Sequence, residues 1–564
     1  MKKRRWYVAD FETTGVKFYE ENGYTKVWLY AICDEESNII SWGDCIEKFI
    51  HDCATKLAGA IVYFHNLRFD GSFIIDYLLR NGWTYSDDLN NKNKTFNTLI
   101  GDMGQWYSLT LSFGGTKQVH FFDSLKLLPF SVDKIAIDFK LPILKEHIDY
   151  DDYTIDDTRL EYVFHDVRIV AMALKIIKAE GMEYMTTASC AYKSYAKMNG
   201  DDYMKYNFPI LSKEFLTEWR KAYRGGRSQV NPYYQGKILH NIYRYDINSM
   251  YPWVMMTQEL PFGDPIKCDE PGQYKFELYH LRITFELKPD NLPSLLKKGG
   301  LIEGFDSSYY IDSDDMEEIW ISNIDYELLQ RHYRILYVEF LDIYGFYTSD
   351  ELFKSYVNLW YGRKQVDKGA QRIVDKLMLN SLYGKFGSNI EGYHKIPKLD
   401  EDDSLEFENS DIEDMKPYYL PIAIAVTSYA HKRLDDGIMD AGIENFIYCD
   451  TDSIHTLKPM ADCFVDQKKL GYYKLEAIED KGKYVRQKTY IYHTDEEGTK
   501  IVCAGLPEKL KDKLIEQEKE NICNIFKEGL KVEGKLMPKR VKGGTILYET
   551  TFKIKARRNT LLSK

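Results

Sequence analysis

Apolar and polar positions alternate in two ways along the first 185 or so residues of the chain. The stretches RWYVADFETT, AIVYFHNLRFDGSFIIDYLL and QVHFFDSLKLL contain strand-like runs, and RLEYVFHDVRIVAMALKIIKAEGM is helical in its spacing. Alternating strand and helix patterns are typical of α/β domains. The first part of the chain is therefore predicted to be an α/β domain.

Turn signals and apolar runs mark further segments downstream. AYRGGRSQVNP is a turn-rich joint, IYRYDINSMYPWVM begins as a strand and ends at Pro252, and LFKSYVNLWYGRKQVDKGAQRIVDKLMLNSLYGKFGSN reads as helices that end at glycines. Residues 258–351 show no pattern that assigns a fold, and the acidic stretch 392–416 resembles an inserted loop or hairpin. A helix-then-strand region then carries IYCDTDSIH, and a lysine-rich tail ends the chain.

Length and composition bound the class of protein. A chain of 564 residues with 44% hydrophobic and 15% aromatic residues predicts several folded domains. The 45 tyrosines suit stacking on bases as well as half-buried packing. Nine cysteines without a paired C-x-x-C pattern indicate reduced, cytoplasmic thiols. The chain contains no apolar run long enough for a membrane span, and MKKRRWYVADFE does not fit a signal peptide.

Charge is distributed unevenly. The net charge of −12 argues against a nucleic-acid partner at first, but residues 505–564 hold 15 Lys/Arg against 8 Asp/Glu. Residues 392–416 hold nine acids and three bases. Acidic groups of catalytic type lower the total without preventing DNA binding elsewhere. The net charge therefore does not decide the partner.

A first group of acids lies near the N-terminus. Asp10 and Glu12 are two positions apart, so in a strand both point to one face. Asp70 sits at an expected strand-to-helix turn, and Tyr162 and Asp166 share one face of a helix. Four carboxylates and a hydroxyl could hold two metals about 3.5–4 Å apart and orient a water for phosphodiester hydrolysis. The alternative for each residue alone is an ordinary solvent-facing acid.

A second group of polar residues follows the joint. Asp246 ends a strand in DINSMYP, and Asp450 and Asp452 repel one another near a chain reversal unless a divalent cation lies between them. The helix KLMLNSLYG places Lys376, Asn380 and Tyr383 on one stripe that ends at a glycine. These are the parts that phosphoryl transfer requires.

A basic ridge extends this stripe toward the N-terminus of the same region. Lys364, Lys368, Arg372 and Lys376 recur every four residues, a spacing that suits a triphosphate. The alternative is a solvated helix face, which would be preferred if the other motifs were missing.

The motifs together resemble those of family-B DNA polymerases. D-x-E, N-x-x-x-D (Asn66, Asp70) and Y-x-x-x-D are similar to the motifs of DEDD-type 3′–5′ exonucleases, and D-x-x-S-hydrophobic-Y-P, K-x-x-x-N-S-x-Y-G and Y-x-D-T-D-S to those of the polymerase active site. YRGG resembles the linker motif that balances synthesis against proofreading, and KTY the K-x-Y motif that holds the primer terminus. Motif order and chain length resemble the protein-primed, phi-29-type phage subgroup over nearly the whole chain.

The resemblance implies a role for each matching residue. In the polymerase it implies metal ligation by Asp246, Asp452 and the main chain of Ile247, with Asp450 in support. It implies nucleotide contacts by Tyr251, Lys364, Arg372, Lys376, Asn380 and Tyr383, and DNA contacts by Tyr223, Gly225, Gly226, Ser249, Lys488 and Tyr490. In the exonuclease it implies metal ligation by Asp10, Glu12, Asp70 and Asp166, catalytic help from Tyr162 and Lys145, and single-strand contacts by Thr13, His65, Asn66, Phe69, Ser124 and Leu125. Met250, where leucine is commoner, conserves volume.

The implied fold is an α/β and α+β multidomain protein, in which an RNase H-like exonuclease domain precedes a right-hand polymerase with two insertions. The boundaries are 1–186 for the exonuclease, 187–257 and 417–520 for the palm, 258–351 for a terminal-protein region, 352–391 for the fingers, 392–416 for a processivity loop and 521–564 for the thumb. The acidic composition of 392–416 is unusual for a segment beside DNA.

The function implied is replicative, protein-primed DNA synthesis with 3′–5′ proofreading and strand displacement. The resemblance implies two Mg²⁺ ions per active site, replaceable by Mn²⁺, and the partners primer-template DNA, single-stranded DNA, dNTPs and a terminal protein. A monomer without membrane contact, in the cytoplasm of a bacterial host, is expected. The alternatives are a nucleic-acid-primed family-B polymerase and a catalytically silent DNA-binding scaffold; a stand-alone nuclease would explain only the first third of the chain.

Overall fold

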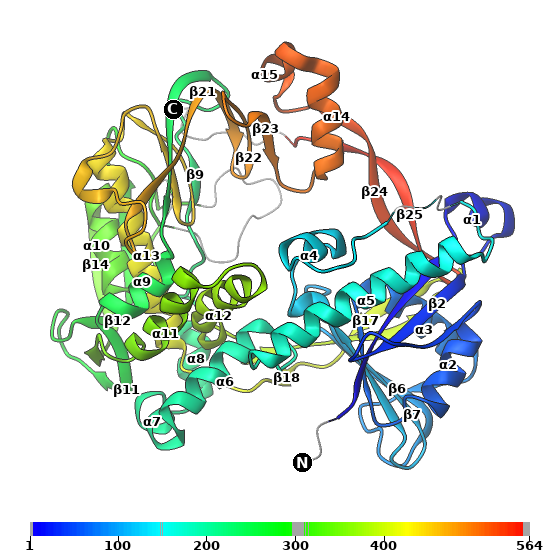
Figure 1. Cartoon of the computed structure of the whole chain (residues 1–564). Coiled ribbons are helices and arrows are strands. Elements are labelled where there is room, and N and C mark those ends of the chain that lie inside the picture. The colour runs from blue at the N-terminus through cyan, green and yellow to red at the C-terminus, as the bar shows by residue number, and fades with distance from the viewer. Residues whose placement is uncertain are drawn as a thin grey trace.

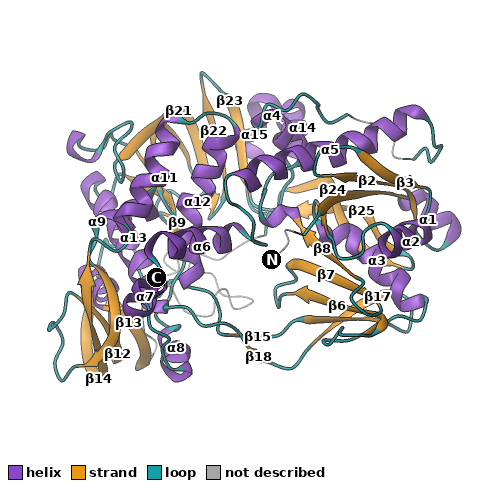
Figure 2. Ribbon diagram, turned by 60° about the horizontal axis from the view of Figure 1, so that its bottom comes forward, coloured by secondary structure: helices purple, strands orange, loops and turns teal. Residues whose placement is uncertain are grey.

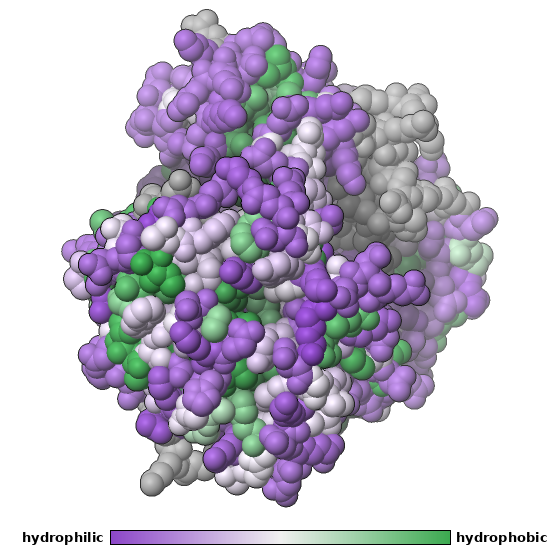
Figure 3. Space-filling model, turned by 90° about the vertical axis from the view of Figure 1, so that its right-hand side faces the viewer, coloured by the Kyte–Doolittle hydropathy of each residue, from purple (hydrophilic) through white to green (hydrophobic). Residues whose placement is uncertain are grey.

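The computed structural model describes residues 4–146, 148, 151–295, 309–310, 312–313 and 315–555. Helices and strands mix along the described part of the chain, which contains three large sheets (Figures 1 and 2). In the described part of the chain, no helix has both the length and the apolar character needed to cross a bilayer. Seen from the right of Figure 1, the surface is mostly hydrophilic, with apolar residues in small patches (Figure 3).

The first large sheet, called here the N-terminal sheet, has eight strands in the order β3-β2-β1-β4-β8-β7-β6-β5. β1 runs parallel to β4, and β4 to β8, whereas β1–β2, β2–β3, β6–β7 and β7–β8 are antiparallel. The strands are β1 (Trp6–Thr13), β2 (Val27–Asp34), β3 (Ile39–Gly43), β4 (Ile61–Phe64), β5 (Thr84–Tyr85), β6 (Asn93–Ile100), β7 (Trp106–Phe113) and β8 (Gln118–Asp123).

Helices cover both faces of the N-terminal sheet. One face packs on the apolar residues of the long α5, and the other on α2 and α3, so that two separate apolar clusters flank the strands. The helices are α1 (Val16–Asn22), α2 (Ile46–Thr55), α3 (Leu67–Arg80), α4 (Val132–Asp138) and α5 (Asp157–Ala179), with a 3₁₀ turn η1 (Ser124–Lys126). The α/β domain predicted for this part of the chain is confirmed.

The second large sheet, called here the central sheet, is antiparallel with the order β23-β22-β21-β10-β20-β19-β9. Its strands come from segments far apart in the sequence: β10 pairs with β20 and β21, which follow it by more than two hundred residues. The strands are β9 (Ser228–Val230), β10 (Ile238–Ile247), β19 (Phe446–Asp450), β20 (Ser453–Thr456), β21 (Tyr473–Arg486), β22 (Thr489–Thr494) and β23 (Gly498–Cys503).

Further helices of the described part of the chain lie between the strands of the central sheet and before them in sequence, and α13 packs on strand β20. The longest, α13, is buried along most of its length and packs on α9, α10 and α12. The helices are α6 (Thr187–Asn199), α7 (Asp201–Asn207), α8 (Lys213–Trp219), α9 (Met250–Thr257), α11 (Lys354–Val366), α12 (Ala370–Phe386) and α13 (Leu420–Ala441), with a 3₁₀ turn η2 (Asp462–Phe464).

The described residues of 258–351, a range to which the sequence assigned no fold, form a third large sheet and a helix. Its order is β11-β14-β12-β13, all antiparallel, and α10 packs against it. The elements are β11 (Leu260–Lys267), β12 (Phe276–Leu287), β13 (Glu317–Ser322), α10 (Asn323–His332) and β14 (Tyr333–Ser349).

The acidic stretch is a hairpin, as one of the two sequence interpretations held. β16 and β17 pair as an antiparallel hairpin, called here the acidic hairpin, and the short β15 and β18 pair at its base. Leu405 is 2% exposed and belongs to an apolar cluster of the N-terminal sheet, so the hairpin rests on that domain. The strands are β15 (Glu391–Gly392), β16 (Lys395–Leu399), β17 (Leu405–Asn409) and β18 (Glu413–Asp414).

The C-terminal part ends in a long hairpin that reaches back to the N-terminal domain. β24 and β25, called here the C-terminal hairpin, extend to the region of α1 and α3 (Figure 1). At its tip, Thr25 donates its N–H to the Lys542 carbonyl over 2.9 Å, and Ser72 Oγ lies 2.9 Å from Thr545 Oγ1. The elements are α14 (Glu508–Glu518), η3 (Lys519–Asn521), α15 (Ile522–Ile525), β24 (Lys531–Val541) and β25 (Gly544–Lys553).

Two local expectations were wrong. The basic ridge does not lie on one continuous helix, because α11 ends at Val366 and α12 begins at Ala370, with Lys368 in the break beside the left-handed Gly369. The segment around Pro252 does not end there: β10 ends at Ile247, and Pro252 lies in the first turn of α9. A first-turn proline leaves no intrahelical hydrogen bond unmade.

Candidate active sites

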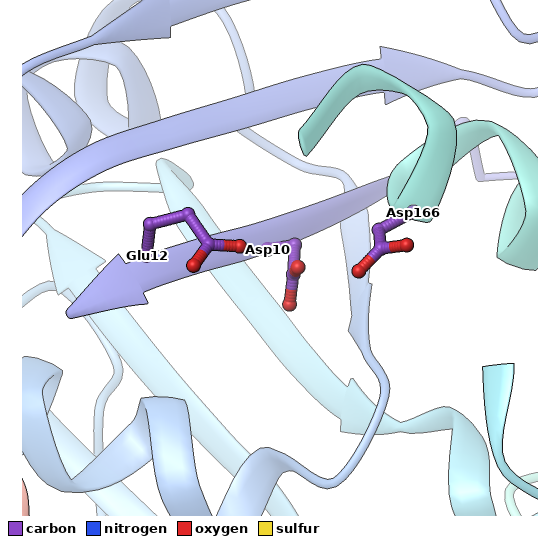
Figure 4. Close-up of side chains that lie close together, drawn as sticks. All are labelled: Asp10, Glu12 and Asp166. Carbon is purple, nitrogen blue, oxygen red and sulfur yellow. The ribbon is translucent and has the colours of Figure 1, made fainter. Parts of the chain in front are cut away.

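The four N-terminal carboxylates line one cavity of about 230 Å³. β1 carries Asp10 and Glu12 on one face, and α5 packs on that face and supplies Asp166. One oxygen from each of these three residues lies within 4.8 Å of the others (Figure 4). Asp70, from α3, lines the same cavity but falls outside this close group of three. The predicted juxtaposition of three distant segments is therefore present.

Burial and mutual repulsion shift the titration of these acids. Burial, aided by the charge of Asp166, raises the pKa of Asp10 to about 7. Burial, with Asp10 adding, likewise raises the pKa of Glu12 and of Asp70 well above the ordinary values. The repulsion between crowded, buried carboxylates is relieved when they bind protons or a cation.

Lys145 and Tyr162 stand beside Asp166, as predicted. Lys145 Nζ donates to Asp166 Oδ2 and lies 3.2 Å from the Tyr162 hydroxyl. Asp166 Oδ1 is buried and has no hydrogen-bond partner among the residues that the structure describes. An all-oxygen donor set with one unpartnered buried oxygen fits a hard divalent cation.

The residues predicted to contact single-stranded DNA fall into two groups by their position in the structure. Thr13 at the end of β1 and Phe69 in the first turn of α3 line a hollow of about 1000 Å³ that continues along β25. His65 instead faces inward: its Nδ1 lies 2.9 Å from Ser124 Oγ, and its Nε2 donates to the Phe130 carbonyl over 2.7 Å. His65 and Ser124 therefore contact one another.

Asp123 organises this region and was not among the predicted residues. Its Oδ1 accepts the N–H groups of Asn66 at 3.1 Å, Leu67 at 3.3 Å and Leu125 at 3.1 Å. One carboxylate thereby joins the loop before α3 to the turn after β8 and supports the left-handed backbone of Asn66. The sequence signal was its position directly before Ser124 in FFDSLK.

In the central sheet, strand pairing brings the second group of carboxylates together. β20 lies between β10 and β19, so Asp246 and Asp450 both pair with Ser453. The turn holding Asp452 is anchored on both sides: the Asp452 N–H donates to the Asp450 carbonyl, and the Ile247 N–H to the Asp452 carbonyl, both over 2.7 Å.

Burial raises the pKa of Asp246 to about 7, and the charges of Asp452 and Glu476 add to the shift. Burial also raises the pKa of Asp452, with Asp450 adding. Glu476, on β21 beside β10, was not predicted, because LEAIED carries no motif that sets it apart. Its proximity to Asp246 became visible only through the pairing of β10 with β21.

The KTY motif lies against the hairpin of β19 and β20, called here the central hairpin, which carries Asp450 and Asp452. Lys488 Nζ is 3.1 Å from Asp450 Oδ2, and the Lys488 N–H donates to the Tyr448 hydroxyl over 3.1 Å. Tyr490 stacks on Tyr484 with ring centroids 5.1 Å apart. The predicted primer-binding residues thus meet the hairpin of Asp450 and Asp452.

The predicted nucleotide-binding residues come from three helices: Tyr251 from α9, Lys364 from α11, and Arg372, Lys376, Asn380 and Tyr383 from α12. Arg372, Lys376 and Asn380 are exposed, and Tyr383 is half-buried with its ring 4.2 Å from that of Tyr251. Lys364 Nζ donates to Ser249 Oγ over 2.8 Å, and Arg372 donates to the Lys364 carbonyl. Lys364 on α11 therefore lies near Arg372 on α12, because the two helices pack side by side.

The YRGG motif contacts both the central hairpin and the end of α12. A Cβ atom on Gly226 would lie 2.7 Å from Thr451 Oγ1, so only glycine fits there. Tyr223 lies against Gly387, and the Gly225 carbonyl accepts a hydrogen bond from His431 Nε2 over 2.6 Å. The motif is therefore adjacent to the carboxylate turn.

The chain matches the family described as DNA polymerase type B, organellar and viral, over residues 52–154 and 149–469. It is 35% identical to the DNA polymerase of Bacillus phage phi29 over 98% of this chain and 99% of that one. It is 32% identical to the DNA polymerase of Streptococcus phage Cp-1 over 98% of each chain.

Solved structures agree with the sequence comparison. Phi29 DNA polymerase complexed with primer-template DNA matches with a TM-score of 0.88 and 34% identity, over 98% of this chain and all of that one. The ternary complex of the same protein with primer-template DNA and incoming nucleotides matches equally well. The multidomain exonuclease-and-polymerase fold expected from the motifs is thereby confirmed, and so is the resemblance itself. This chain is a DNA-directed DNA polymerase and belongs to the phi29-type family-B polymerases.

Proposed function

We propose that this polymerase replicates DNA from a protein primer, proofreads with a 3′–5′ exonuclease and displaces the strand ahead of it. The observation that carries the proposal is the presence of two separate carboxylate groups on two different sheets. Asp10, Glu12, Asp70 and Asp166 line a cavity at the N-terminal sheet, and Asp246, Asp450 and Asp452 meet at the central sheet. Two such groups suit two reactions on DNA, one synthetic and one hydrolytic.

In the central sheet, Asp246, Asp452 and the Ile247 carbonyl would hold Mg²⁺, with Mn²⁺ as a substitute. When bound, two such ions would neutralise charge on the oxygens of the transferred phosphoryl group. Lys364, Arg372 and Lys376 would bind the triphosphate, and Tyr251 and Tyr383, whose rings contact one another, would line the sugar and base. Lys488 and Tyr490 would hold the primer terminus beside Asp450.

In the N-terminal cavity, Asp10, Glu12, Asp70 and Asp166 would hold the second set of ions. Lys145 and Tyr162 would keep Asp166 oriented and would stabilise negative charge that develops on the cleaved phosphodiester. Thr13, Asn66, Phe69 and Leu125 would support the terminal nucleotides, and His65 with Ser124 would hold the wall of the site together.

The partners are proposed from the relatives. Phi29 polymerase has been solved with primer-template DNA, with single-stranded DNA and with nucleotides, and we assign the same ligands to this chain. A terminal protein would contact residues 258–351 and offer a hydroxyl as the first primer. We propose that the enzyme acts as a monomer in the cytoplasm of a bacterial host, a proposal that its similarity to phage polymerases supports.

Separation of the two activities tests the proposal. Asp452→Asn keeps the size of the side chain but removes one charge, and synthesis is expected to fall by orders of magnitude while single-stranded DNA is still degraded. Asp10→Ala with Asp70→Ala should remove degradation and leave primer extension. Extension of a primed circle and trimming of a labelled primer without dNTPs measure both activities.

Two results would contradict the proposal. Equal loss of both activities in Asp452→Asn would refute two independent sites, and trimming at the parent rate in the double variant would refute the exonuclease assignment. Reactions with and without a terminal protein separate protein priming from the nucleic-acid-primed alternative.

A further inference from the structure

A cluster of charged side chains lies buried where three distant segments meet. Arg227 precedes β9, Asp435 belongs to α13, and Arg331 and His332 end α10. The side chain of Arg227 is 2% exposed, and those of Asp435 and His332 are fully buried. Buried charges are tolerated only when each is closely paired, so the arrangement of this cluster is tightly constrained.

Asp435 is the centre of the cluster. Its Oδ1 accepts hydrogen bonds from Arg227 Nη1 at 2.7 Å and from His332 Nε2 at 2.8 Å, and its Oδ2 accepts one from Arg331 Nη1 at 2.8 Å. Arg227 also donates to Gln229 Oε1, at 3.0 and 3.2 Å, and to the Pro293 carbonyl over 3.4 Å. The guanidinium of Arg227 cannot shift without leaving the Asp435 carboxylate incompletely paired.

The main chain of Arg227 supports the turn between the two acids of the central hairpin. Its carbonyl accepts the N–H of Thr451 over 2.7 Å. Thr451 stands between Asp450 and Asp452 with φ +60°, a left-handed conformation that a β-branched residue adopts only where its surroundings impose it. The same segment pairs with β19, with Ser228 opposite Asp450.

We propose that Arg227, held in place by Asp435 and His332, is a positioning residue for DNA synthesis. By fixing the carbonyl that bonds to Thr451, it holds the strained turn that aims Asp450 and Asp452. His332 and Arg331 belong to residues 258–351, so that segment contributes to the geometry of the polymerase site as well as to any protein contact. This inference rests on the role proposed above for Asp452.

Three variants test the inference in the full-length enzyme. Arg227→Met removes the charge, Arg227→Lys retains it with fewer donors, and Asp435→Asn removes the central carboxylate. Single-nucleotide addition gives kcat and the KM for dNTP, and titration with Mg²⁺ gives the half-saturating concentration. Degradation of single-stranded DNA in the same preparation reports on the N-terminal domain.

Loss of a group that orients metal-binding residues typically costs about 10- to 100-fold in activity or metal affinity. We expect a kcat loss of that size in Arg227→Met and Asp435→Asn, a higher requirement for Mg²⁺, a KM for dNTP close to the parent value and unchanged degradation. Arg227→Lys should recover part of the loss. If Arg227→Met does not fold, Arg227→Lys and Asp435→Asn decide the question.

Glu277→Gln is the matched control. Glu277 is a fully buried carboxylate of the 258–351 sheet that accepts the N–H groups of Gly272 and Tyr274, away from the hairpin. The Glu277→Gln variant should have a lower melting temperature than the parent and the same kcat. A parent kcat in the Arg227 and Asp435 variants, or parallel loss of synthesis and degradation, would overturn the inference. Asp452→Asn is run alongside: if it too retains synthesis, the proposed site itself has failed, which is a different result.

Discussion

The tip of the C-terminal hairpin docks on the N-terminal domain, and Gly543→Ala should undock it. Gly543 has φ +92°, and a Cβ atom there would lie 1.9 Å from the main-chain oxygen of Thr25. Backbone cannot move aside as a flexible side chain would, so the tip must shift. The shift would break the bond from the Thr25 N–H to the Lys542 carbonyl and the bond between Ser72 and Thr545, each 2.9 Å long.

Each of these hydrogen bonds contributes about 0.5–1.5 kcal/mol net, so docking should weaken by about 1–3 kcal/mol. That range corresponds to a fall of about 5- to 150-fold in the ratio of docked to undocked tip. The ion pair between Lys542 and Asp403 of the acidic hairpin, 2.9 Å long with both side chains about half exposed, is worth less than about 1 kcal/mol and is screened by salt. The uncharged contacts therefore decide docking, and the effect of Gly543→Ala should persist at high salt.

Product length on a primed circle, measured with a DNA trap so that each enzyme binds once, reports the consequence. If DNA leaves when the tip undocks, single-binding products should shorten by at least about fivefold, whereas filling of a short gap should be nearly unchanged. Gly529→Ala is the control, because Gly529 has φ +84° with nothing within 4 Å of its added Cβ, and so carries the backbone strain without the collision. Equal product lengths for the two variants would refute the idea that tip docking retains DNA.

Other perturbations have defined outcomes. Tyr251→Val should raise ribonucleotide incorporation relative to dNTP, because the Tyr251 ring, whose centroid is 4.2 Å from that of Tyr383, would lie under C2′ of the incoming sugar. A variant that melts at a lower temperature but keeps the parent selectivity would show that Tyr251 is a core residue instead. Burial raises the pKa of Glu479 to about 7 from 4.5, so the folded protein holds a proton that the unfolded chain releases, and stability falls as pH rises between those values. Glu479→Gln should remove that pH dependence, which is worth about 3 kcal/mol of unfolding free energy, in denaturant titrations at pH 5 and pH 8. If the variant loses as much unfolding free energy between these pH values as the parent does, Glu479 is not the cause. Replacing residues 392–416 by a short Gly/Ser linker should spare short gap filling but cut strand displacement and long products, and a linker variant that copies a primed circle as the parent does would contradict this.

Local sequence pattern determined a large part of the N-terminal domain. Period-two spacing put Asp10 and Glu12 on one strand face, and period-3.6 spacing put Tyr162 and Asp166 on one helix face, as the structure confirms. The stripe of Arg372, Lys376 and Asn380 followed from the same rule. These features depend on neighbours within about one helical turn, whose geometry the backbone alone sets.

Features that join distant segments could not be obtained in that way. The 258–351 sheet was missed because its edge strand β11 pairs with β14 some eighty residues later, and the break before Ala370 depends on how α11 folds back on α12. The roles of Asp123 and Glu476 follow from which strands lie beside them. Nothing in the sequence marks Glu476, and the signal for Asp123 is its position directly before Ser124.

The sequence by itself determined the family, the α/β start of the chain and the identity of both carboxylate groups, because motifs and periodicity are written in residues close to one another. Only the tertiary structure decided that Asp435 bonds to Arg227 across 208 residues and that Thr451 rests on the Arg227 carbonyl. The physical reason is that burial pairs charges by position in space, and a charged residue in a sequence carries no mark of the partner that folding will bring to it.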